Sequence, residues 1–210
     1  MKIYDAVRNG LTSFEDYVPY QIPNAIRDEL PECLKKMGYK VGAEIGVYKG
    51  LYTRFFLKQG LKMYAVDPWE PYPDYEGSEA NNIERMKVVY NKTHRNVKEF
   101  GDQCVIIKKY SDEALKDFAD ESLDFVYIDA NHGFKYVASD LVEWSKKVRK
   151  GGVVAGHDYF YRKLLPNQEA CQVGYVLDAY VKAFDIKNWY VIGRKESGKC
   201  DRHRSWFWIK

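Results

Sequence analysis

The sequence predicts an α/β fold: a doubly wound sheet of about seven strands, mostly parallel, with helices on both faces and an antiparallel C-terminal hairpin. The first observation behind this prediction is a series of short apolar runs, which cover 41–45, 62–66, 104–108, 123–129 and 153–155. These runs alternate with segments of helical composition, as parallel strands and their crossover helices do. The second observation is a glycine turn at 46–50, directly after the first run. The third is a pair of aromatic runs, 189–193 and 205–209, which flank a charged turn and indicate the hairpin.

Helices are predicted in the segments that connect or follow these strands, over 51–59, 78–100, 113–118, 134–149 and 173–184. Gly60 and Gly101 follow the first two of these segments, at positions where glycine commonly ends a helix. In the long polar helix over 78–100, we expect a buried stripe formed by Ile83, Met86, Tyr90 and Val97. Each strand is therefore followed by a helix that can return the chain to the same edge of the sheet.

A chain of 210 residues is long enough for one domain with a short arm. We divide it into an N-terminal helical arm, 1–38, and an α/β domain, 39–210. In the arm, residues 24–37 have an apolar face and Asn24 as a candidate cap. Because a proline fits only the first turn of a helix, the alternative is a shorter helix that begins at Pro31.

The composition argues against several classes of protein. With 33 basic and 30 acidic residues, the net charge of +3 is too small to indicate a nucleic-acid partner. The N-terminus lacks the apolar segment of a secretory signal, and no apolar run approaches the length of a membrane span. The four cysteines share no metal-binding spacing and are expected to be reduced. We therefore expect a cytoplasmic protein with no membrane partner.

The glycine turn has the form E-x-G-x-x-x-G, in which Glu44 belongs to the preceding strand. The pyrophosphate fingerprint of dinucleotide-binding proteins is absent, because Tyr48 occupies the position of its second glycine. The Glu44 carboxylate would repel a pyrophosphate, and it suits a ligand that carries an amine or a positive charge. Asp67 follows the strand 62–66, where a ribose diol would find a carboxylate acceptor. These features predict a nucleoside ligand without phosphates.

A second group of polar residues follows the fourth and fifth predicted strands. Asp129 ends one strand, and the pair His157-Asp158 follows the other. The two carboxylates, with Asn131 and His132 nearby, could hold a divalent cation such as Mg²⁺, Ca²⁺ or Mn²⁺. A histidine at this position could instead act as a general base. The structural alternative is that Asp158 caps a loop and that His157 is a buried, hydrogen-bonded imidazole.

Two stretches of the chain resemble the class I S-adenosylmethionine-dependent methyltransferases. They are Glu44-Ile-Gly-Val-Tyr-Lys-Gly50 with Asp67, and D-x-x-H with D-L-x-x-W and K-G-G-V-V-x-G-H-D-Y between 129 and 159. The second stretch is similar to a branch of small O-methyltransferases that act on sugars, phenols and natural products. The resemblance covers roughly 40–160 and implies a Rossmann-like class I methyltransferase domain over 39–210, with S-adenosylmethionine as its cofactor. It implies that the cofactor-binding residues are Glu44, Gly46, Tyr48, Gly50, Asp67, Ser111, Asp112 and Asp129.

In the metal-dependent members of this branch, an acid after strand four and an acid pair after strand five bind magnesium. Here the pair is His157-Asp158, so a metal held by Asp129 and Asp158 and a reaction with a histidine base both stay open. The catalytic residues expected from the resemblance are Asp129, His157 and Asp158. The loops 68–77 and 159–172 leave the same edge of the sheet and are candidate walls of the acceptor site. Ser111 is expected to contact the adenine, to cap the following helix, or to do both.

The resulting expectation is an O-methyltransferase that acts on a small-molecule or glycan acceptor. In many small methyltransferases such an N-terminal arm covers the cofactor or forms a dimer contact, which implies a homodimer as one arrangement. One alternative is a nucleic-acid methyltransferase, although Asp129-Ala-Asn-His differs from the Asp/Asn-Pro-Pro-aromatic turn of adenine-N6 enzymes. The other alternative is a cofactor-binding module without catalysis.

Overall fold

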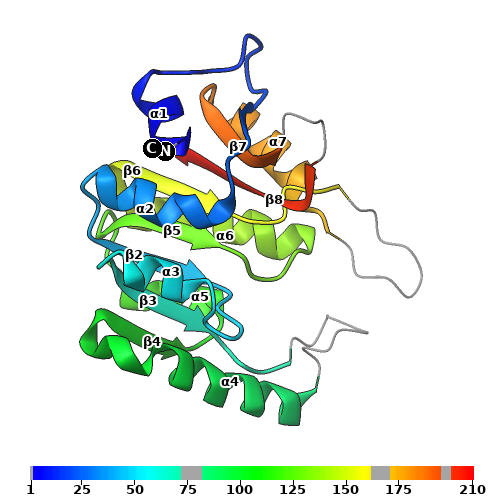
Figure 1. Ribbon diagram of the computed structural model, residues 1–210. Helices are drawn as coiled ribbons and strands as arrows, with labels where there is room; N and C mark the ends of the chain where they lie inside the picture. Colours follow the sequence, from blue (N-terminus) through cyan, green and yellow to red (C-terminus); the bar gives the residue numbers. More distant parts are fainter. Residues whose placement is uncertain (1, 72–81, 162–170, 195–199) are drawn as a thin grey trace.

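The computed structural model describes residues 2–71, 82–161, 171–194 and 200–210 (Figure 1). Several predicted features lie outside this part of the chain. They are residues 72–77 and 162–170 of the two predicted acceptor loops, the predicted start of a helix at Ser78, and the middle of the charged hairpin turn. The strands are β1 (Tyr20–Pro23), β2 (Val41–Ile45), β3 (Lys62–Asp67), β4 (Cys104–Lys108), β5 (Leu123–Ile128), β6 (Val148–Gly156), β7 (Trp189–Arg194) and β8 (Cys200–Ile209). The α-helices are α1 (Lys2–Arg8), α2 (Leu30–Lys36), α3 (Thr53–Lys58), α4 (Ile83–Val97), α5 (Ser111–Ala114), α6 (Phe134–Lys147) and α7 (Val173–Ala183). Short 3₁₀ turns are η1 (Arg27–Glu29), η3 (Lys98–Gln103) and η4 (Leu115–Asp117).

The strands form one sheet in the order β1-β7-β8-β6-β5-β2-β3-β4, which confirms the predicted α/β class. Strand β8 pairs antiparallel with both β6 and β7, and the other described pairs are parallel. The C-terminal hairpin therefore lies within the sheet, and β1 from the N-terminal arm adds the eighth strand beyond β7. The sequence prediction missed β1 because a four-residue strand has too few positions to show a periodicity.

Alternate side chains of each central strand enter cores on opposite faces of the sheet. In β5, Val126 packs with α6 and α7 on one face, whereas Phe125 and Tyr127 pack with α2 and α3 on the other. The rings of Phe56 and Phe125 are fully buried and stack with their centroids 5.4 Å apart. Burying one such ring contributes about 1.5–3 kcal/mol, so this pair fixes α3 against β5.

The arm packs onto the same core through residues of α1, β1 and α2, among them Ile3, Ile22 and Leu34. Helix α2 begins at Leu30 and holds Pro31 in its first turn, as in the shorter of the two predicted helices. Asn24 has a φ of +56° and lies upstream of the helix, so it is not the cap. No helix in the described part of the chain is both long and apolar enough to span a bilayer.

The predicted stripe of α4 is correct at Met86 and Val97 and wrong at Ile83, which is 53% exposed. The described helix begins at Ile83, and the side chain of Asn82 caps it by accepting from the backbone N–H of Arg85 at 2.9 Å. Thr93 is fully buried instead. Its hydroxyl is satisfied by backbone carbonyls, so a stripe defined by apolar residues alone could not find it.

Candidate active site

The turn between β2 and α3 depends on Gly46, which has a φ of +89°. A Cβ at this position would lie 2.2 Å from the carbonyl oxygen of Asp129. The N–H of Gly46 donates to the carbonyl of Val66 at 2.9 Å. Glycine is therefore required because three strand ends, those of β2, β3 and β5, converge at this residue.

The next residues of the turn are fixed by hydrogen bonds to the Tyr48 backbone, which has a φ of +52°. The carboxylate of Asp67 accepts from the N–H of Tyr48 at 2.8 Å and from that of Trp69 at 2.7 Å. The carbonyl of Tyr48 accepts from the indole of Trp69 at 2.8 Å and from the hydroxyl of Thr93 at 2.6 Å. Asp67 thus holds the glycine turn beside the end of β3, and Trp69 and Thr93 are contributors that the sequence prediction missed.

Glu44 is 2% exposed, and it accepts a hydrogen bond of 2.5 Å from the hydroxyl of Thr53 at the start of α3. Burial raises the pKa of Glu44 to about 8 and that of Asp67 to above its ordinary value. Desolvation disfavours a carboxylate that no nearby cation fully compensates. Open α/β sheets bind ligands in a crevice at the carboxyl ends of their strands, so we use the term crevice for the region beside Glu44, Gly46 and Asp67. A ligand that brings a positive charge to this region would be bound most tightly by the ionised form of Glu44.

The burial of Glu44 predicts how the stability of the wild type, compared with the variant Glu44→Gln, depends on pH. Because the folded pKa of about 8 exceeds the ordinary 4.5, folded protein binds more protons than unfolded protein between these values. Wild-type stability should therefore fall, relative to the variant, by up to about 1.4 kcal/mol per pH unit across this window, and level off above it. Urea unfolding of both proteins at pH 5, 6.5 and 8.5 measures the difference. Parallel pH profiles would contradict the buried, ionisable state of Glu44.

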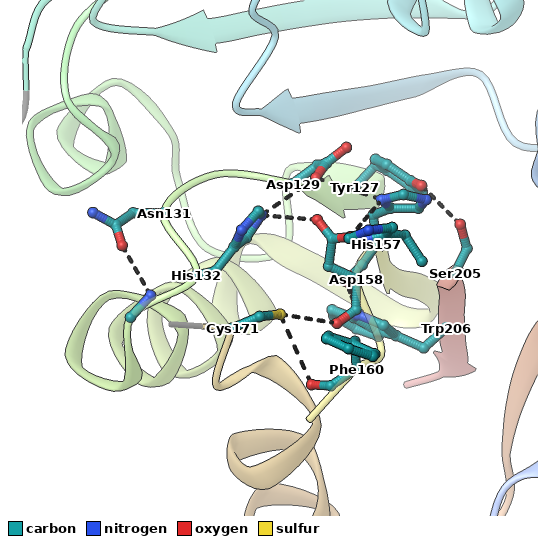
Figure 2. A network of polar contacts seen from close by, with 12 residues as sticks. Tyr127, Asp129, Asn131, His132, His157, Asp158, Phe160, Cys171, Ser205 and Trp206 are labelled. Carbon is teal, nitrogen blue, oxygen red and sulfur yellow. Dashed lines mark hydrogen bonds and ion pairs between the residues drawn. The ribbon is translucent and has the colours of Figure 1, made fainter. Parts of the chain in front are cut away.

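A cluster of acids and histidines occupies the carboxyl ends of β5 and β6 (Figure 2). The Nε2 of His132 lies 2.9 Å from Oδ2 of Asp158, and Nδ1 of His157 lies 3.3 Å from Oδ1 of the same carboxylate. The ring of His203, which extends from β8, contacts Oδ1 of Asp158 as well. Asp129 is farther away, with its Oδ1 3.8 Å from each of the nitrogens of His132 and His157. The buried Asp158 thus orients three imidazoles.

Charge within this cluster shifts two pKa values in opposite directions. Burial alone would raise the pKa of Asp158, but its contacts with His132 and His157 hold the pKa well below its usual range. Burial would lower the pKa of His132, yet the carboxylates of Asp129 and Asp158 raise it to about 10. At neutral pH, Asp158 is therefore an anion that keeps a positive charge on His132.

The same residues have the donor atoms of a cation site. Asp129, His132 and Asp158 each present a ligand atom within 4.8 Å of the others. The Nε2 of His132 faces the carboxylates of both Asp158 and Asp129, and the buried amide nitrogen of Asn131 makes no hydrogen bond in the described part of the protein. The structure thus adds His132 to the predicted metal pair of Asp129 and Asp158, and two carboxylates with one imidazole are a donor set that fits a divalent cation.

Ser111 and Asp112 lie at the start of α5, beyond the end of β4. The Ser111 hydroxyl donates to the buried carboxylate of Asp140 and accepts from the indole of Trp144 at 2.7 Å. Burial raises the pKa of Asp140 to about 7. Ser111 does not cap the helix, because the cap position belongs to Tyr110. The hydroxyl of Ser111 is thus directed at α6, and Asp112 is exposed at the rim.

Two cavities of about 540 and 450 Å³ lie at the edge of the sheet where the parallel strands begin, away from Glu44, Asp67 and Asp158. One is lined by residues that include Asn188 and Lys210, and the other by residues that include Val41 and Lys62. These positions are at the amino ends of the parallel strands. Ligands of open α/β sheets bind at the carboxyl ends, where the acids and histidines gather.

The sequence matches the model of a methyltransferase domain family over residues 43–159, more than half of the chain. The chain therefore belongs to this family, and the predicted class, a class I S-adenosylmethionine-dependent methyltransferase, is confirmed. The matched region contains Glu44, the glycine turn, Asp67, Asp129 and Asp158. It leaves out the N-terminal arm and β8.

Solved structures with the same fold have low sequence identity to the chain. A Staphylococcus aureus protein assigned as a caffeoyl-CoA O-methyltransferase is 14% identical, with a TM-score of 0.61 over 98% of this chain and 88% of the other. An O-methyltransferase from Bacillus cereus in complex with S-adenosylhomocysteine is 12% identical, with a TM-score of 0.61 over 99% and 88%. A Burkholderia thailandensis 1,6-didemethyltoxoflavin N1-methyltransferase is 14% identical, with a TM-score of 0.52 over 84% and 74%. A comparison with curated proteins found no match.

Proposed function

We propose that this methyltransferase transfers the methyl group of S-adenosylmethionine to a hydroxyl oxygen of a small molecule, such as a sugar or phenol. The observation that carries the proposal is the cluster of Asp129, His132, His157 and Asp158 at the carboxyl ends of β5 and β6. A hydroxyl is a weak nucleophile until its proton is removed or its oxygen is polarised. The cluster supplies groups that can do either, beside the crevice formed by Glu44, Gly46 and Asp67.

In this proposal, the crevice orients the cofactor so that its methyl group is in line with the acceptor oxygen. Asp67 accepts from the ribose hydroxyls, and Glu44 faces the ammonium group of the methionine part. His157 directs Nδ1 at Asp158, so its Nε2 is the atom that takes the proton from the acceptor hydroxyl. Asp158 stabilises the imidazolium that forms.

A divalent cation is the second element of the proposal. Asp129, His132 and Asp158 would hold it, with the cation replacing the proton on His132. The two carboxylates suit Mg²⁺ or Mn²⁺, and the imidazole among the ligands moves the preference toward Fe²⁺ or Zn²⁺ relative to an all-carboxylate set. When bound, such a cation would act as a Lewis acid that lowers the pKa of the acceptor hydroxyl.

The test is an assay of S-adenosylhomocysteine formation over panels of sugars, phenols and nucleosides, with and without EDTA. Turnover with a hydroxyl acceptor supports the proposal, and loss of turnover in EDTA with recovery on Mn²⁺ or Mg²⁺ establishes the metal. Turnover with RNA or with amines alone would favour another acceptor class. Binding of S-adenosylhomocysteine without any turnover would favour a cofactor-binding module.

Replacing Asp67 tests the cofactor side of the proposal separately. Asp67→Ala should weaken S-adenosylhomocysteine binding about 10- to 100-fold, because it removes a charged acceptor for the ribose. Calorimetric titration measures the loss. Glu70→Ala is the matched control, since Glu70 is a nearby exposed acid that pairs with Lys108 at 3.1 Å. Equal affinities of the two variants would refute the role of Asp67.

A further inference from the structure

Arg27 brings a positive charge from the N-terminal arm to the crevice at the ends of β2 and β5. It lies in η1, between β1 and α2, outside the region that matches the methyltransferase family. Its guanidinium NH1 is 3.7 Å from Oδ2 of Asp129, and the charge of Glu44 also acts on it. Arg27 is therefore a cation of the arm that lies beside the two crevice acids.

Both ends of Arg27 are held by aromatic residues. The hydroxyl of Tyr52 donates to the carbonyl of Arg27 at 2.8 Å, which fixes the backbone. The guanidinium carbon lies 3.9 Å above the ring centroid of Tyr52 and 6.0 Å from that of Tyr127. Both rings are buried, so they form a rigid platform for the guanidinium.

The N–H groups of this guanidinium are available to a ligand. A guanidinium has five N–H groups, and here none of them makes a hydrogen bond to a residue that the structure describes, since Asp129 is beyond hydrogen-bonding distance. The side chain is 31% exposed, so a ligand in the crevice can reach it. A preorganised, half-buried arginine with free donors suits a carboxylate, which it can bind through two parallel hydrogen bonds.

We propose that Arg27 binds the carboxylate of the amino acid part of the cofactor. The inference rests on the proposed use of S-adenosylmethionine, whose methionine part carries an ammonium and a carboxylate on the same carbon. Glu44 offers the charge that an ammonium requires, and Arg27 offers the opposite charge for the carboxylate. Without Arg27, a ligand carboxylate would face the two acids Glu44 and Asp129 with no compensation.

Calorimetry with two ligands tests this assignment. One ligand is S-adenosylhomocysteine, and the other is S-adenosyl-3-thiopropylamine, the same molecule without its carboxylate. Arg27→Met should weaken binding of the first about 10- to 100-fold and leave binding of the second within about twofold. Arg27→Lys keeps the positive charge but lacks the paired N–H donors of a guanidinium, so it should bind S-adenosylhomocysteine more tightly than Arg27→Met and less tightly than wild type. Arg8→Met, an exposed arginine of α1, is the matched control and should bind both ligands as wild type does.

The outcomes separate this inference from the proposed function. Equal losses for both ligands in Arg27→Met would mean that Arg27 only shapes the crevice, and unchanged S-adenosylhomocysteine binding would mean that it does not contact the cofactor. Either result overturns the assignment of Arg27 and leaves the proposed use of S-adenosylmethionine unaffected. Wild-type protein that binds neither ligand would overturn the proposed cofactor and the role of Arg27 with it. Thermal unfolding is the control for folding: if Arg27→Met has the same midpoint as wild type, the arm is still folded.

Discussion

Asp158→Asn should lower kcat on the order of a thousandfold, although the variant should still bind the cofactor. The carboxylate contacts three imidazoles, those of His132, His157 and His203. An asparagine has nearly the same shape but no charge, and its amide NH₂ would oppose one of the ring N–H groups. The His157 ring would lose both its orientation and the anion that stabilises its protonated form. If a cation is required, the same substitution removes one of its ligands.

The measurement is a comparison of kcat with the dissociation constant of S-adenosylhomocysteine. Asp158 is separate from Glu44, Gly46 and Asp67, so we expect cofactor affinity to stay within about threefold of wild type. Asp117→Asn is the control, because Asp117 is a surface acid that pairs with Lys109 at 2.6 Å, away from the cluster. Asp158→Asn with more than a tenth of wild-type kcat would show that the cluster has a structural role only.

Much of the architecture follows from two local rules of sequence. Apolar runs followed by helices predict parallel strands, and the carboxyl ends of parallel strands share one edge. The acids in the last positions of these runs or directly after them, such as Glu44, Asp67 and Asp129, are therefore expected at one edge, and the structure places them there. Gly46 is part of the glycine turn that the sequence predicts, but the reason that glycine is required, the Asp129 backbone, lies more than 80 residues away.

Residues that act through distant contacts could not be predicted in this way. His203 reaches Asp158 because β8 lies beside β6, a neighbour that the predicted hairpin alone does not specify. Arg27 reaches the crevice through a four-residue strand and a single 3₁₀ turn, which carry little periodic signal. The Ser111 hydroxyl is directed at Asp140, a contact that depends on how α5 packs against α6. Side-chain direction is set by tertiary packing, which a motif does not record.

Gly46→Ala should destabilise the protein by about 3 kcal/mol or more and abolish cofactor binding. Two costs add at this position. A φ of +89° is unfavourable for any residue with a Cβ, and that Cβ would lie 2.2 Å from the carbonyl oxygen and 2.6 Å from the carbonyl carbon of Asp129. The obstructing atoms are backbone, so relief requires the ends of β2 and β5 to move apart. That movement would separate Glu44 from Asp129 and displace the Tyr48 turn.

Gly38→Ala separates the two costs. Gly38 follows α2 and has the same φ of +89°, but a Cβ there would meet no atom within 4 Å. Its substitution should cost only the backbone strain, about 1 kcal/mol, and leave cofactor binding unchanged. For a chain of this length, the two variants should then differ by roughly 5 °C or more in thermal midpoint. Equal midpoints would show that φ alone explains the glycine, and that the approach of the Asp129 backbone does not constrain the site.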